Sequence, residues 1–444
     1  MKKIILFGAG RSTTALIQYL LDHAEELNAN LLIVDQDKAL IEDKINGHSR
    51  GEALVLDIFK ESERKALIQS ADVVISMLPA RFHQIIAEDC LAFSKSLFTA
   101  SYLSPELKAM DKKAQEKGIL FLNEIGLDPG IDHMSAKKVI DEVHEKGGKF
   151  TSFKSFCGGL IADKYDTNPW NYKFTWNPRN VVLAGQGVAQ FLEHGKYKYT
   201  PYSSLYSRTE SMDILNYGQF EAYANRDSLS YRKHYEIDYI PTIFRGTLRK
   251  PDYCKHWDAF VKLGMTDDTY AMTDIEGMTF REFTNSFLPY STEKLEDKFK
   301  AFTGLDDISR FEWLGLFSDQ TITLSKGSPA QVLQSILVPK WELEEEDKDL
   351  IVMQHQFEYE IDGQAYKHKS SFGLEGKDSQ MTGMAMTVGY PLAIAVKMYL
   401  KGKITRTGVH IPVHKNIYNP ILEELEKMNI TFIEEINEVS EFAL

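Results

Sequence analysis

Cysteine is scarce in this chain of 444 residues, which contains only Cys90, Cys157 and Cys254. The three lie far apart and form no CxxC pair, so they provide neither a disulfide framework nor a zinc ribbon. We therefore expect no metal site and a reducing, cytoplasmic environment.

Positive charge is also in deficit, since 51 Lys and Arg stand against 64 Asp and Glu, for a net charge of -13. No run is rich in Lys and Arg, and nucleic-acid binding depends on such cations, so we expect no nucleic-acid partner. The remaining composition, 43% hydrophobic and 26% charged, is that of a globular protein and excludes a disordered or fibrous class.

Long apolar runs are rare. Residues 4–7 form too short a run for the core of a signal peptide, so we expect no export. Residues 379–396 carry no charge over nearly the length of a membrane span, but the segment contains Gly383, Gly389 and Pro391 and has no partner span. We expect it to be a helix buried between domains, and we expect no membrane partner.

Short β-branched runs alternate with helical patterns over the first 125 residues, as in consecutive βαβ units. This pattern predicts an α/β fold whose first domain, residues 1–130, is a Rossmann-type doubly wound parallel sheet with helices on both faces. We expect its strands at residues 3–7, 31–35, 53–57, 72–76, 97–101 and 119–123.

The character of the chain changes after residue 130, because Tyr, Trp and Phe become frequent and the regular alternation disappears. Residues 131–376 are predicted to form a larger mixed α+β domain for substrate binding and dimerisation, with strands at 149–156, 320–324 and 351–361. Residues 377–444 return to helices and two strands, at 409–413 and 431–434, and are expected to pack back on the first domain.

A glycine turn follows the first predicted strand and opens a helix. Gly8 permits the tight turn and Gly10 lets the backbone approach a pyrophosphate, while Arg11 and Ser12 begin the helix whose N-terminus favours anions. The third position of the fingerprint is Thr13 rather than Gly or Ala. We expect dinucleotide binding here, the alternative being a glycine turn without a ligand.

Other strand ends complete the predicted cofactor site. Asp35 stands where a carboxylate binds the free 2′-OH of NAD and repels the 2′-phosphate of NADP, so NAD is predicted to be preferred over NADP. The opposing observation is Arg11 in the glycine turn, which is long enough to reach a 2′-phosphate, the alternative being a contact with the pyrophosphate or an exposed position. The remaining predicted contacts are Asp57 and Ile58 beside the adenine, and Ser76 and Leu78 beside the nicotinamide ribose.

Two polar loops follow the fifth and sixth strands. The first contains Thr99, Ala100, Ser101 and Tyr102, and the second, residues 123–133, holds two glycines, a proline and several acids before a histidine. Ligands of open α/β sheets bind outside the carboxyl ends of strands, so both loops are candidates to face a ligand. His133 has the alternative of a structural histidine, and Asp132 that of a helix cap.

Five of the thirteen arginines fall within one fifty-residue window: Arg208, Arg226, Arg232, Arg245 and Arg249. Guanidinium groups bind carboxylates in bidentate fashion, so the cluster indicates a pocket for an anionic small molecule. The alternative is a set of surface ion pairs.

Seven blocks occur in order across most of the chain: TASYLSP at 99–105, NEIGLDPGIDH at 123–133, SFCGGL at 155–160, NP at 168–169, YKFTW at 172–176, NRDS at 225–228 and RGTLR at 245–249. Together they resemble the glutamate-forming saccharopine dehydrogenases, also called saccharopine reductases. The resemblance implies a two-domain homodimeric oxidoreductase of lysine metabolism. The implied reaction converts saccharopine, NAD(P)+ and water to L-glutamate, 2-aminoadipate 6-semialdehyde and NAD(P)H, reversibly.

The resemblance also implies roles for single residues. Ser101 and Tyr102 are expected to touch the substrate, Asp128 to face the cleft, and Arg226, Arg245, Thr247 and Arg249 to hold carboxylates; Gly10, Arg11, Asp57, Ile58 and Trp176 are expected to line the cofactor side. The NADP-using fungal members carry no carboxylate where Asp35 stands, whereas the animal domain of the same activity uses NAD. Asp128, His133 and Tyr102 are the candidates for proton transfer near neutral pH.

Two rival functions remain open from the sequence. One is a related imine reductase acting on polyamine or lysine-derived substrates, such as a carboxynorspermidine-type enzyme or a lysine 6-dehydrogenase, which needs fewer guanidinium contacts. The other is a catalytically silent protein that binds NAD(H).

Overall fold

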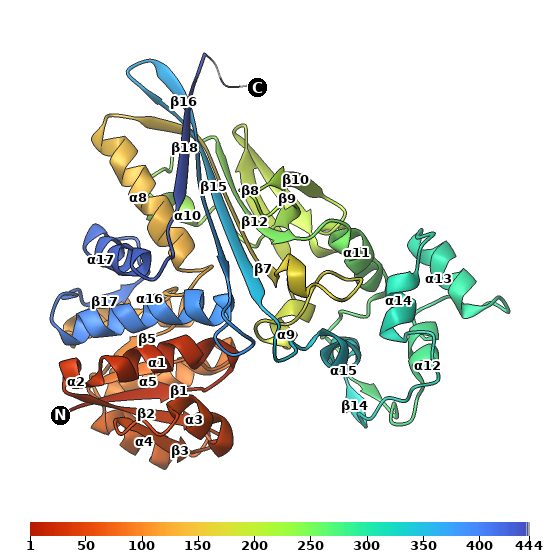
Figure 1. The fold of residues 1–444 in the computed structure, drawn as a ribbon, viewed down its shortest axis with the longest axis horizontal. Helices are drawn as coiled ribbons and strands as arrows, with labels where there is room; N and C mark the ends of the chain where they lie inside the picture. The colour runs from red at the N-terminus through yellow and green to blue at the C-terminus, as the bar shows by residue number, and fades with distance from the viewer. Residues whose placement is uncertain (441, 443–444) are drawn as a thin grey trace. The chain divides into compact units, whose positions relative to one another are not determined.

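The computed structural model describes residues 1–440 and residue 442. The chain divides into two compact units (Figure 1). The first comprises Met1–Lys149, Ile361–Gly363 and Leu374–Ile433, and the second comprises Phe150–Glu360, Gln364–Gly373 and the described residues from Glu434 onward.

A seven-stranded sheet forms the centre of the first unit, every residue of which is described, in the order β17-β6-β5-β4-β1-β2-β3. All neighbouring strands are parallel, and the order reverses between β1 and β4 as in a Rossmann-type sheet. The six predicted strands are confirmed, with shifted ends. The strands are β1 (Lys2–Phe7), β2 (Ala29–Asp35), β3 (Gly51–Val55), β4 (Val73–Ser76), β5 (Ser96–Phe98), β6 (Leu120–Leu122) and β17 (Gly408–His410).

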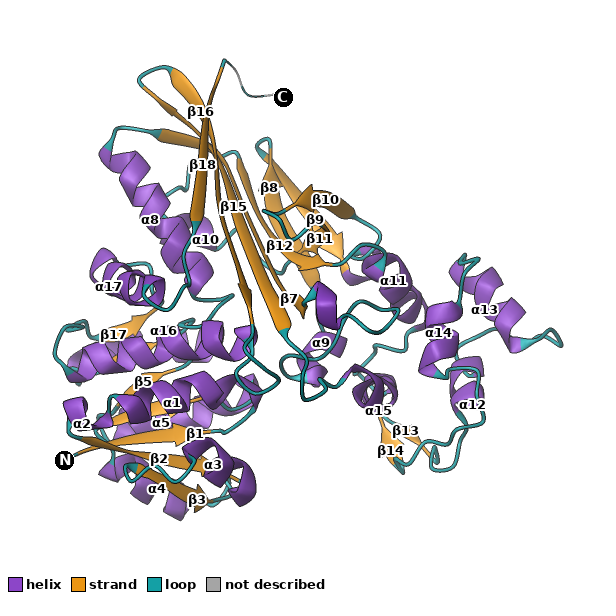
Figure 2. Cartoon of the chain, viewed as in Figure 1, coloured by secondary structure: helices purple, strands orange, loops and turns teal. Residues whose placement is uncertain are grey.

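Helices cover both faces of this sheet, which explains why its strands are continuous apolar runs. On one face, Ile68 and Cys90 from α4 and α5 share a core with Ile5 and Phe7 of β1. Elsewhere α1 packs against α16 (Figure 2). The helices are η1 (Arg11–Thr13), α1 (Thr14–Asp22), α2 (Ala24–Leu27), α3 (Lys38–Ile45), α4 (Glu61–Ser70), η2 (Ala80–Phe82), α5 (His83–Ala92), α6 (Pro105–Lys108), α7 (Asp111–Glu116), α8 (Ile131–Glu145), α16 (Gly383–Leu400) and α17 (Lys415–Glu426).

The first unit is larger than the domain of residues 1–130 that the sequence indicated. It extends to Lys149 because α8 packs against α17, and the chain returns to it from Leu374 onward. The return segment adds β17 beside β6. Its last strand, β18, instead pairs with β16 in the second unit, so the predicted segment 377–444 is divided between the units; residues 441, 443 and 444 lie outside the described residues.

The uncharged segment near the C-terminus forms α16. By length and composition it is the one helix, among the described residues, that meets the criteria for a membrane span, yet 78% of that window is buried inside the protein. It lies within the first unit against α1, α17 and η1, so the expected buried helix is present, inside one unit rather than between two.

A nine-stranded sheet organises the described part of the second unit, with the main order β10-β11-β12-β7-β15-β16-β18 and with β8 pairing both β12 and β9. β12 is parallel to β7 and antiparallel to β11, so the sheet is mixed, as predicted. Its strands are β7 (Lys149–Ile161), β8 (Val188–Glu193), β9 (Lys196–Pro201), β10 (Thr209–Asp213), β11 (Gln219–Ala224), β12 (Thr242–Arg249), β15 (Asp349–Ile361), β16 (Gln364–Glu375) and β18 (Ile433–Val439). A separate antiparallel pair is formed by β13 (Met272–Thr273) and β14 (Lys326–Gly327).

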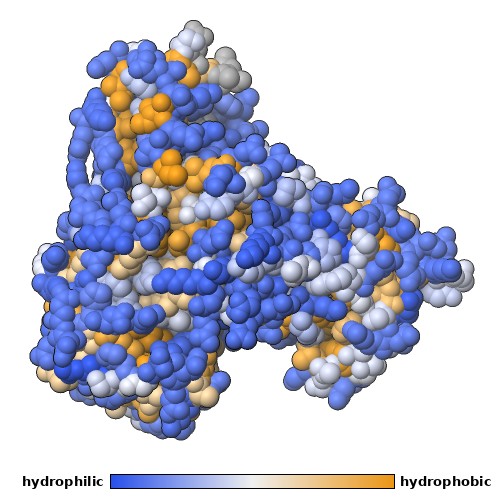
Figure 3. All heavy atoms as spheres, viewed as in Figure 1, coloured by the Kyte–Doolittle hydropathy of each residue, from blue (hydrophilic) through white to orange (hydrophobic). Residues whose placement is uncertain are grey.

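An aromatic core fills the helical part of the second unit. Trp170 stacks on Phe260 and meets Trp257 and Trp341 edge-on or tilted, which accounts for the aromatic-rich sequence. The visible face of the molecule is mainly hydrophilic (Figure 3). The helices are η3 (Asp163–Tyr165), α9 (Pro178–Val182), η4 (Tyr202–Ser204), α10 (Tyr231–His234), α11 (Tyr253–Leu263), α12 (Phe280–Asn285), α13 (Leu295–Thr303), α14 (Ser309–Leu314) and α15 (Pro329–Trp341).

One predicted strand of the second unit is wrong. Residues 320–324 form no strand, and the segment makes only an isolated bridge between Thr321 and Thr279. Its alternating pattern is explained by Ile322, which enters the helical aromatic core rather than a sheet.

Candidate active site

The carboxyl ends of the parallel strands bring most of the predicted site residues of the first unit into one row. Following the sheet order, the row contains the loop after β6, then Thr99 to Tyr102 after β5, Ser76 at the end of β4, Gly8 after β1, Asp35 at the end of β2, and the segment with Asp57 after β3. Because the carboxyl ends of parallel strands lie at the same end of the sheet, residues far apart in sequence come close together here.

The glycine turn is packed tightly against its neighbours. Gly8 has a φ of +100°, and a Cβ at this position would lie 2.8 Å from the carbonyl oxygen of Met77 after β4. Its N–H donates to the Val34 carbonyl at 2.8 Å. Around Gly10, by contrast, a Cβ would meet nothing within 4 Å, so the open side of the turn leaves room for the pyrophosphate of a dinucleotide.

Two side chains stabilise the glycine turn, whose third fingerprint position is Thr13 rather than glycine. The Thr13 hydroxyl donates to the Gly10 carbonyl at 2.8 Å, and the Lys44 ammonium of α3 donates to the same carbonyl and, at 3.0 Å, to the Thr13 hydroxyl. Burial lowers the pKa of Lys44 to about 8. The sequence analysis missed Lys44, since its contact with the turn depends on how α3 packs.

Asp35 is already engaged by the backbone. Its Oδ2 accepts from the N–H of Ala9 in the glycine turn at 2.7 Å, and its Oδ1 accepts from Gln36 at 2.6 Å and from Asp37 at 3.3 Å. A carboxylate has about four acceptor positions, so three of them are occupied by the protein. Asp35 thus joins β2 to the glycine turn before any ligand binds.

The end of β3 is supported by a buried ion pair. Arg64 of α4 donates through Nε to Asp89 at 2.7 Å and through Nη1 to the carbonyl of Ile58. Ile58 is buried, whereas the neighbouring Asp57 is exposed and accepts from the N–H of Phe59. The pair therefore holds the backbone next to an accessible carboxylate, as an adenosine contact requires.

A histidine that the sequence analysis did not single out joins the ends of β4 and β5. The Nδ1 of His83 lies 2.8 Å from the Ser76 hydroxyl, and its Nε2 lies 2.7 Å from the Ser101 hydroxyl. His83 is 4% exposed and begins α5. No local pattern marks it, because its partners come from two neighbouring strands.

Burial gives His83 a testable effect on stability. It lowers the pKa of His83 from 6.5 to about 4, so between these values the unfolded chain binds a proton that the folded chain refuses. Acidification from pH 7 should therefore cost the folded state about 3 kcal/mol through this group alone. His83→Gln should lose less stability than the parent between pH 7 and pH 4.5 in urea unfolding. Equal losses would contradict the assignment.

The loops after β5 and β6 are tied together by hydrogen bonds. The Tyr102 hydroxyl donates to Asp128 at 3.1 Å, and both residues are half-buried. Glu124 accepts from the Leu103 N–H at 2.9 Å and contacts His133 Nε2 at 2.8 Å. The structure thus brings the predicted pair Tyr102 and Asp128 together at the loop surface.

His133 lies in a different setting from the other predicted catalytic residues. It is 0% exposed at the start of α8, between Glu124 and, at 3.7 Å from Nδ1, Asp132. Asp132 lies in the first turn of α8 and accepts at 2.6 Å from the N–H of Gly130, the N-cap residue, so it fixes the turn before the helix without being its cap. This geometry favours a role for His133 in holding Glu124, which in turn holds the Tyr102 loop.

In the second unit, β12 carries three predicted substrate residues on one face. Arg245, Thr247 and Arg249 alternate along the strand, so their side chains project to the same side. Arg245 and Arg249 are buried and Thr247 is partly buried. The guanidinium of Arg245 lies 4.5 Å from the centre of the Tyr231 ring.

Arg249 sits in a cage of tyrosines. It is 4% exposed, and its guanidinium carbon lies 5.1 Å from the ring centre of Tyr172, 5.6 Å from that of Tyr223 and 5.4 Å from that of Tyr253. Its Nη1 donates to its neighbour's carbonyl, the Leu248 oxygen, at 2.8 Å, while its Nε is buried without a hydrogen-bond partner. Among the described residues no carboxylate forms an ion pair with Arg249, so its positive charge is available to an anionic ligand.

The other predicted residues of the second unit are more accessible. Arg226 is exposed just beyond β11, and Trp176 is partly buried against the aromatic core. Of the remaining arginines in the window, Arg208 is exposed, and Arg232 lies 5.8 Å from the ring centre of Tyr197. The window therefore contains two buried guanidinium groups on one strand and several surface ones, and no ion pair with a described carboxylate accounts for Arg249.

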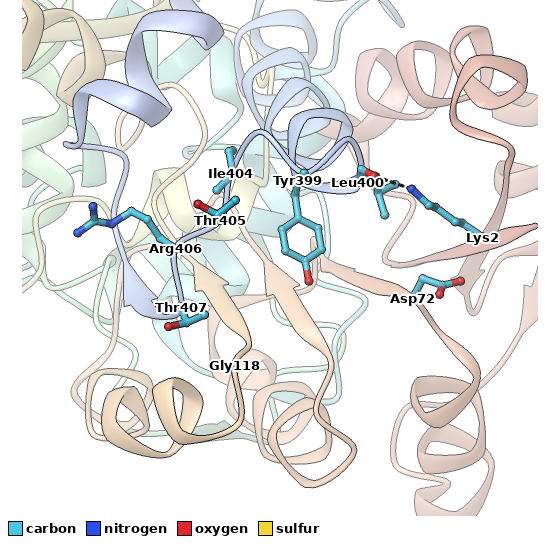
Figure 4. Close-up of a pocket in the computed structure, with 10 residues that line it drawn as sticks. Lys2, Asp72, Gly118, Tyr399, Leu400, Ile404, Thr405, Arg406 and Thr407 are labelled. Carbon is cyan, nitrogen blue, oxygen red and sulfur yellow. Dashed lines mark hydrogen bonds between the residues drawn. The ribbon is translucent and has the colours of Figure 1, made fainter.

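A cavity of about 410 Å³ lies at the other end of the first sheet, where its strands begin (Figure 4). Lys2, Asp72 and Gly118 line it from the amino ends of strands, together with residues 399, 400, 402 and 404–407, and the Lys2 ammonium donates to the carbonyl of Leu400. Ligands of doubly wound sheets bind at the carboxyl ends, so this cavity is not the dinucleotide site. In the described part of the chain no group of three His, Cys, Asp or Glu side chains is placed to hold a metal ion.

Comparisons with known proteins agree with this arrangement. Residues 4–122 match the family model of the saccharopine dehydrogenase NADP binding domain, and residues 126–430 match that of the saccharopine dehydrogenase C-terminal domain. The chain is 31% identical to the saccharopine dehydrogenase [NADP(+), L-glutamate-forming] of Schizosaccharomyces pombe, covering 98% of this chain and 99% of that one. It is 34% identical to the enzyme of the same name from Saccharomyces cerevisiae, covering 96% and 97%.

A solved structure extends the likeness to three dimensions. The apo saccharopine dehydrogenase (L-Glu forming) from Saccharomyces cerevisiae superimposes with a TM-score of 0.87 at 33% identity, over 98% of this chain and 100% of that one. The Rossmann-type sheet and the mixed sheet are thus found together in a protein of known structure.

Proposed function

This chain belongs to the saccharopine dehydrogenase family, and on that premise we propose that it interconverts saccharopine with L-glutamate and 2-aminoadipate 6-semialdehyde. It is an oxidoreductase that uses a nicotinamide cofactor and acts on a CH–NH group. The observation that carries the substrate assignment is Arg249, a buried guanidinium with no acidic partner in the described chain. An unpaired buried charge is costly, and a substrate carboxylate relieves that cost.

Saccharopine fits this requirement because it carries three carboxylates on a secondary amine. Arg245, Thr247 and Arg249 share one face of β12, which supports two guanidinium groups acting on one anionic molecule. Polyamines carry no carboxylate and leave the buried Arg249 unneutralised, and lysine carries one, which is enough for Arg249 but not for a shared role of Arg245. We therefore favour saccharopine over the substrates of related imine reductases.

We propose NADP(H) as the cofactor, which corrects the preference for NAD drawn from Asp35. The matching domain model is named for NADP binding, and the fungal relatives are named for NADP(+). The physical reason is that three backbone N–H groups already occupy the Asp35 carboxylate. Asp35 therefore has a structural task in the glycine turn, and its presence does not by itself indicate a ribose ligand.

The cofactor supplies hydride acceptance, and the chain's own residues supply binding and proton transfer. Gly8, Gly10 and the start of α1 form a turn suited to a pyrophosphate. On oxidation the C–H carbon next to the amine loses a hydride, the resulting imine adds water, and the carbon–nitrogen bond breaks to give amine and aldehyde. We assign the proton transfers of these steps to the hydrogen-bonded pair Tyr102 and Asp128.

A spectrophotometric assay tests this function directly. Purified protein is mixed with saccharopine and NADP+ or NAD+, and with lysine or carboxynorspermidine in place of saccharopine. We expect NADP+ to be reduced when saccharopine is present and not when lysine or carboxynorspermidine takes its place. Turnover only with the other amines would establish the related imine reductase, and nucleotide binding without turnover would establish a silent NAD(P)H-binding protein.

Two further proposals concern the assembly, which follows from the family resemblance, and the location, which follows from the three scattered cysteines. We propose a homodimer in the cytoplasm. Light scattering of the purified protein measures the first, and imaging of a tagged chain in its native cell measures the second.

Asp35 provides a prediction about cofactor choice. Asp35→Asn keeps the oxygen that accepts from Gln36 and Asp37, gives up the acceptor for Ala9, and removes a negative charge close to the expected 2′-phosphate. With the screening of bulk water, relief of that repulsion at a separation of about 4 Å is worth about 1 kcal/mol, so the ratio of kcat/KM for NADP+ to that for NAD+ should rise about fivefold. Asp37→Asn, which alters the exposed carboxylate that caps α3, serves as the control. A falling ratio would show that Asp35 does not face the 2′ position.

A further inference from the structure

A buried histidine connects the cofactor side and the substrate side of the first unit. His83 lies between the Ser76 hydroxyl, at 2.8 Å from Nδ1, and the Ser101 hydroxyl, at 2.7 Å from Nε2. Ser76 ends β4, which neighbours β1 with its glycine turn, and Ser101 follows β5 in the loop that carries Tyr102. One side chain thus touches both predicted halves of the site.

The chemistry of a neutral imidazole makes these two contacts unequal. One ring nitrogen carries a hydrogen and donates, and the other accepts. A serine that receives the ring hydrogen keeps its own O–H free to donate outward. The serine that donates to the ring keeps only oxygen lone pairs to offer outward. His83 therefore leaves one serine with an O–H that can donate to a further group and the other with oxygen lone pairs only.

The expected ligands decide which serine is which. A substrate carboxylate only accepts hydrogen bonds, so Ser101 serves it by donating outward and by taking the Nε2 hydrogen of His83. Nδ1 then accepts from the Ser76 hydroxyl, which is 0% exposed and therefore fixes the ring rather than a ligand. The low pKa that burial imposes on His83 is consistent with a neutral ring throughout.

We propose that His83 is a positioning residue that sets Ser101 as a donor toward the substrate, with the buried Ser76 fixing the orientation of the ring. This proposal rests on the proposed function for the identity of the substrate. The backbone supports the same arrangement, because the Ser101 N–H donates to Thr99 Oγ1 at 3.2 Å and the Ser101 carbonyl accepts from Glu124 at 3.0 Å. Only the hydroxyl direction of Ser101 is then left for His83 to determine.

Two isosteric substitutions separate the two contacts. The amide of His83→Gln reaches the position of Nε2 and retains the bond to Ser101. The amide of His83→Asn reaches the position of Nδ1 and retains the bond to Ser76. The control is His23→Gln, which alters a partly buried histidine of the same unit outside the site.

We expect the two variants to differ toward saccharopine and to agree toward the nucleotide. His83→Asn should lower kcat/KM for saccharopine about tenfold, whereas His83→Gln should lower it less than about threefold. In both variants the NADPH dissociation constant, followed by fluorescence titration, should change less than twofold. Adding Ser101→Ala to His83→Asn should cause little further loss, because the contact is already absent.

Equal losses of kcat/KM in the two variants, or no loss in His83→Asn, would overturn the proposal. Ser101→Ala alone should reproduce the loss of His83→Asn, which keeps the test valid if a His83 variant does not fold. If the parent protein does not turn over saccharopine, the proposed function fails. Calorimetric binding of saccharopine to the NADPH complex still decides then, since His83→Asn and Ser101→Ala should weaken it and His83→Gln should not; absence of binding to the parent would overturn the proposal as well.

Discussion

Arg249→Met is expected to abolish most activity toward saccharopine without harming the fold. Truncating one partner of a buried charge pair costs about 2 to 5 kcal/mol, which corresponds to a loss in kcat/KM of about 30-fold to several thousandfold. Methionine keeps an apolar stem of similar length among Tyr172, Tyr223 and Tyr253. We expect the free energy of unfolding to stay constant or rise, because the variant no longer buries an unpaired charge.

Opposite responses of stability and activity would identify Arg249 as a binding residue. The measurements are steady-state kinetics with saccharopine, fluorescence titration with NADPH, and urea unfolding. NADPH affinity should remain within about twofold of the parent, since Arg249 belongs to the second unit and the glycine turn to the first.

Arg232→Met is the matched control for this prediction. Arg232 lies in the same arginine-rich window, but it is only partly buried and contacts the exposed Tyr197. Its replacement should change kcat/KM less than about threefold. Unchanged kinetics in Arg249→Met, or equal losses in both variants, would refute the carboxylate assignment.

Gly130→Ala is expected to have the largest effect on stability. Gly130 has a φ of +149°, and a Cβ there would lie 2.1 Å from the carbonyl oxygen and 2.2 Å from the nitrogen of Gly126. Both atoms belong to the backbone, and both are hydrogen bonded, to Ile131 and Pro129. The contact cannot be relieved by a side-chain rotation, so the loop must open at a cost of at least about 4 kcal/mol.

Opening that loop also displaces Asp128 from Tyr102, so activity should fall with stability. Gly147→Ala is the control, since Gly147 also has a positive φ, +77°, but a Cβ there would meet nothing within 4 Å. It should lose only about 1 kcal/mol in urea unfolding. Similar losses for the two variants would show that the loop yields more easily than its packing indicates.

The sequence patterns were sufficient for the first sheet because each strand there is a contiguous apolar run. Residues 72–76, predicted from Val73, Val74 and Ile75, became β4 with all four of its residues buried. The same method failed at residues 320–324, where Ile322 enters a helical aromatic core. An apolar residue in a short segment indicates burial, but it does not specify what covers it.

The candidate site divides in a similar way. Ser76 and Ser101 were identified because both end predicted strands of a doubly wound sheet. His83 was missed because its two contacts come from different strands, and Lys44 because it reaches the glycine turn from another helix. Asp35 was identified, but its partners were not, and those partners changed its meaning for cofactor choice.

By itself, the sequence determined the class of the fold, the glycine turn and the likeness to a family, because each depends on residues close together in the chain. Tertiary structure alone decided which charges are buried without a partner and which hydroxyls share a histidine. Burial and hydrogen bonding depend on distances between strands and helices, and the chain brings Arg249 to its tyrosines, and Ser76 to Ser101 through His83, only on folding.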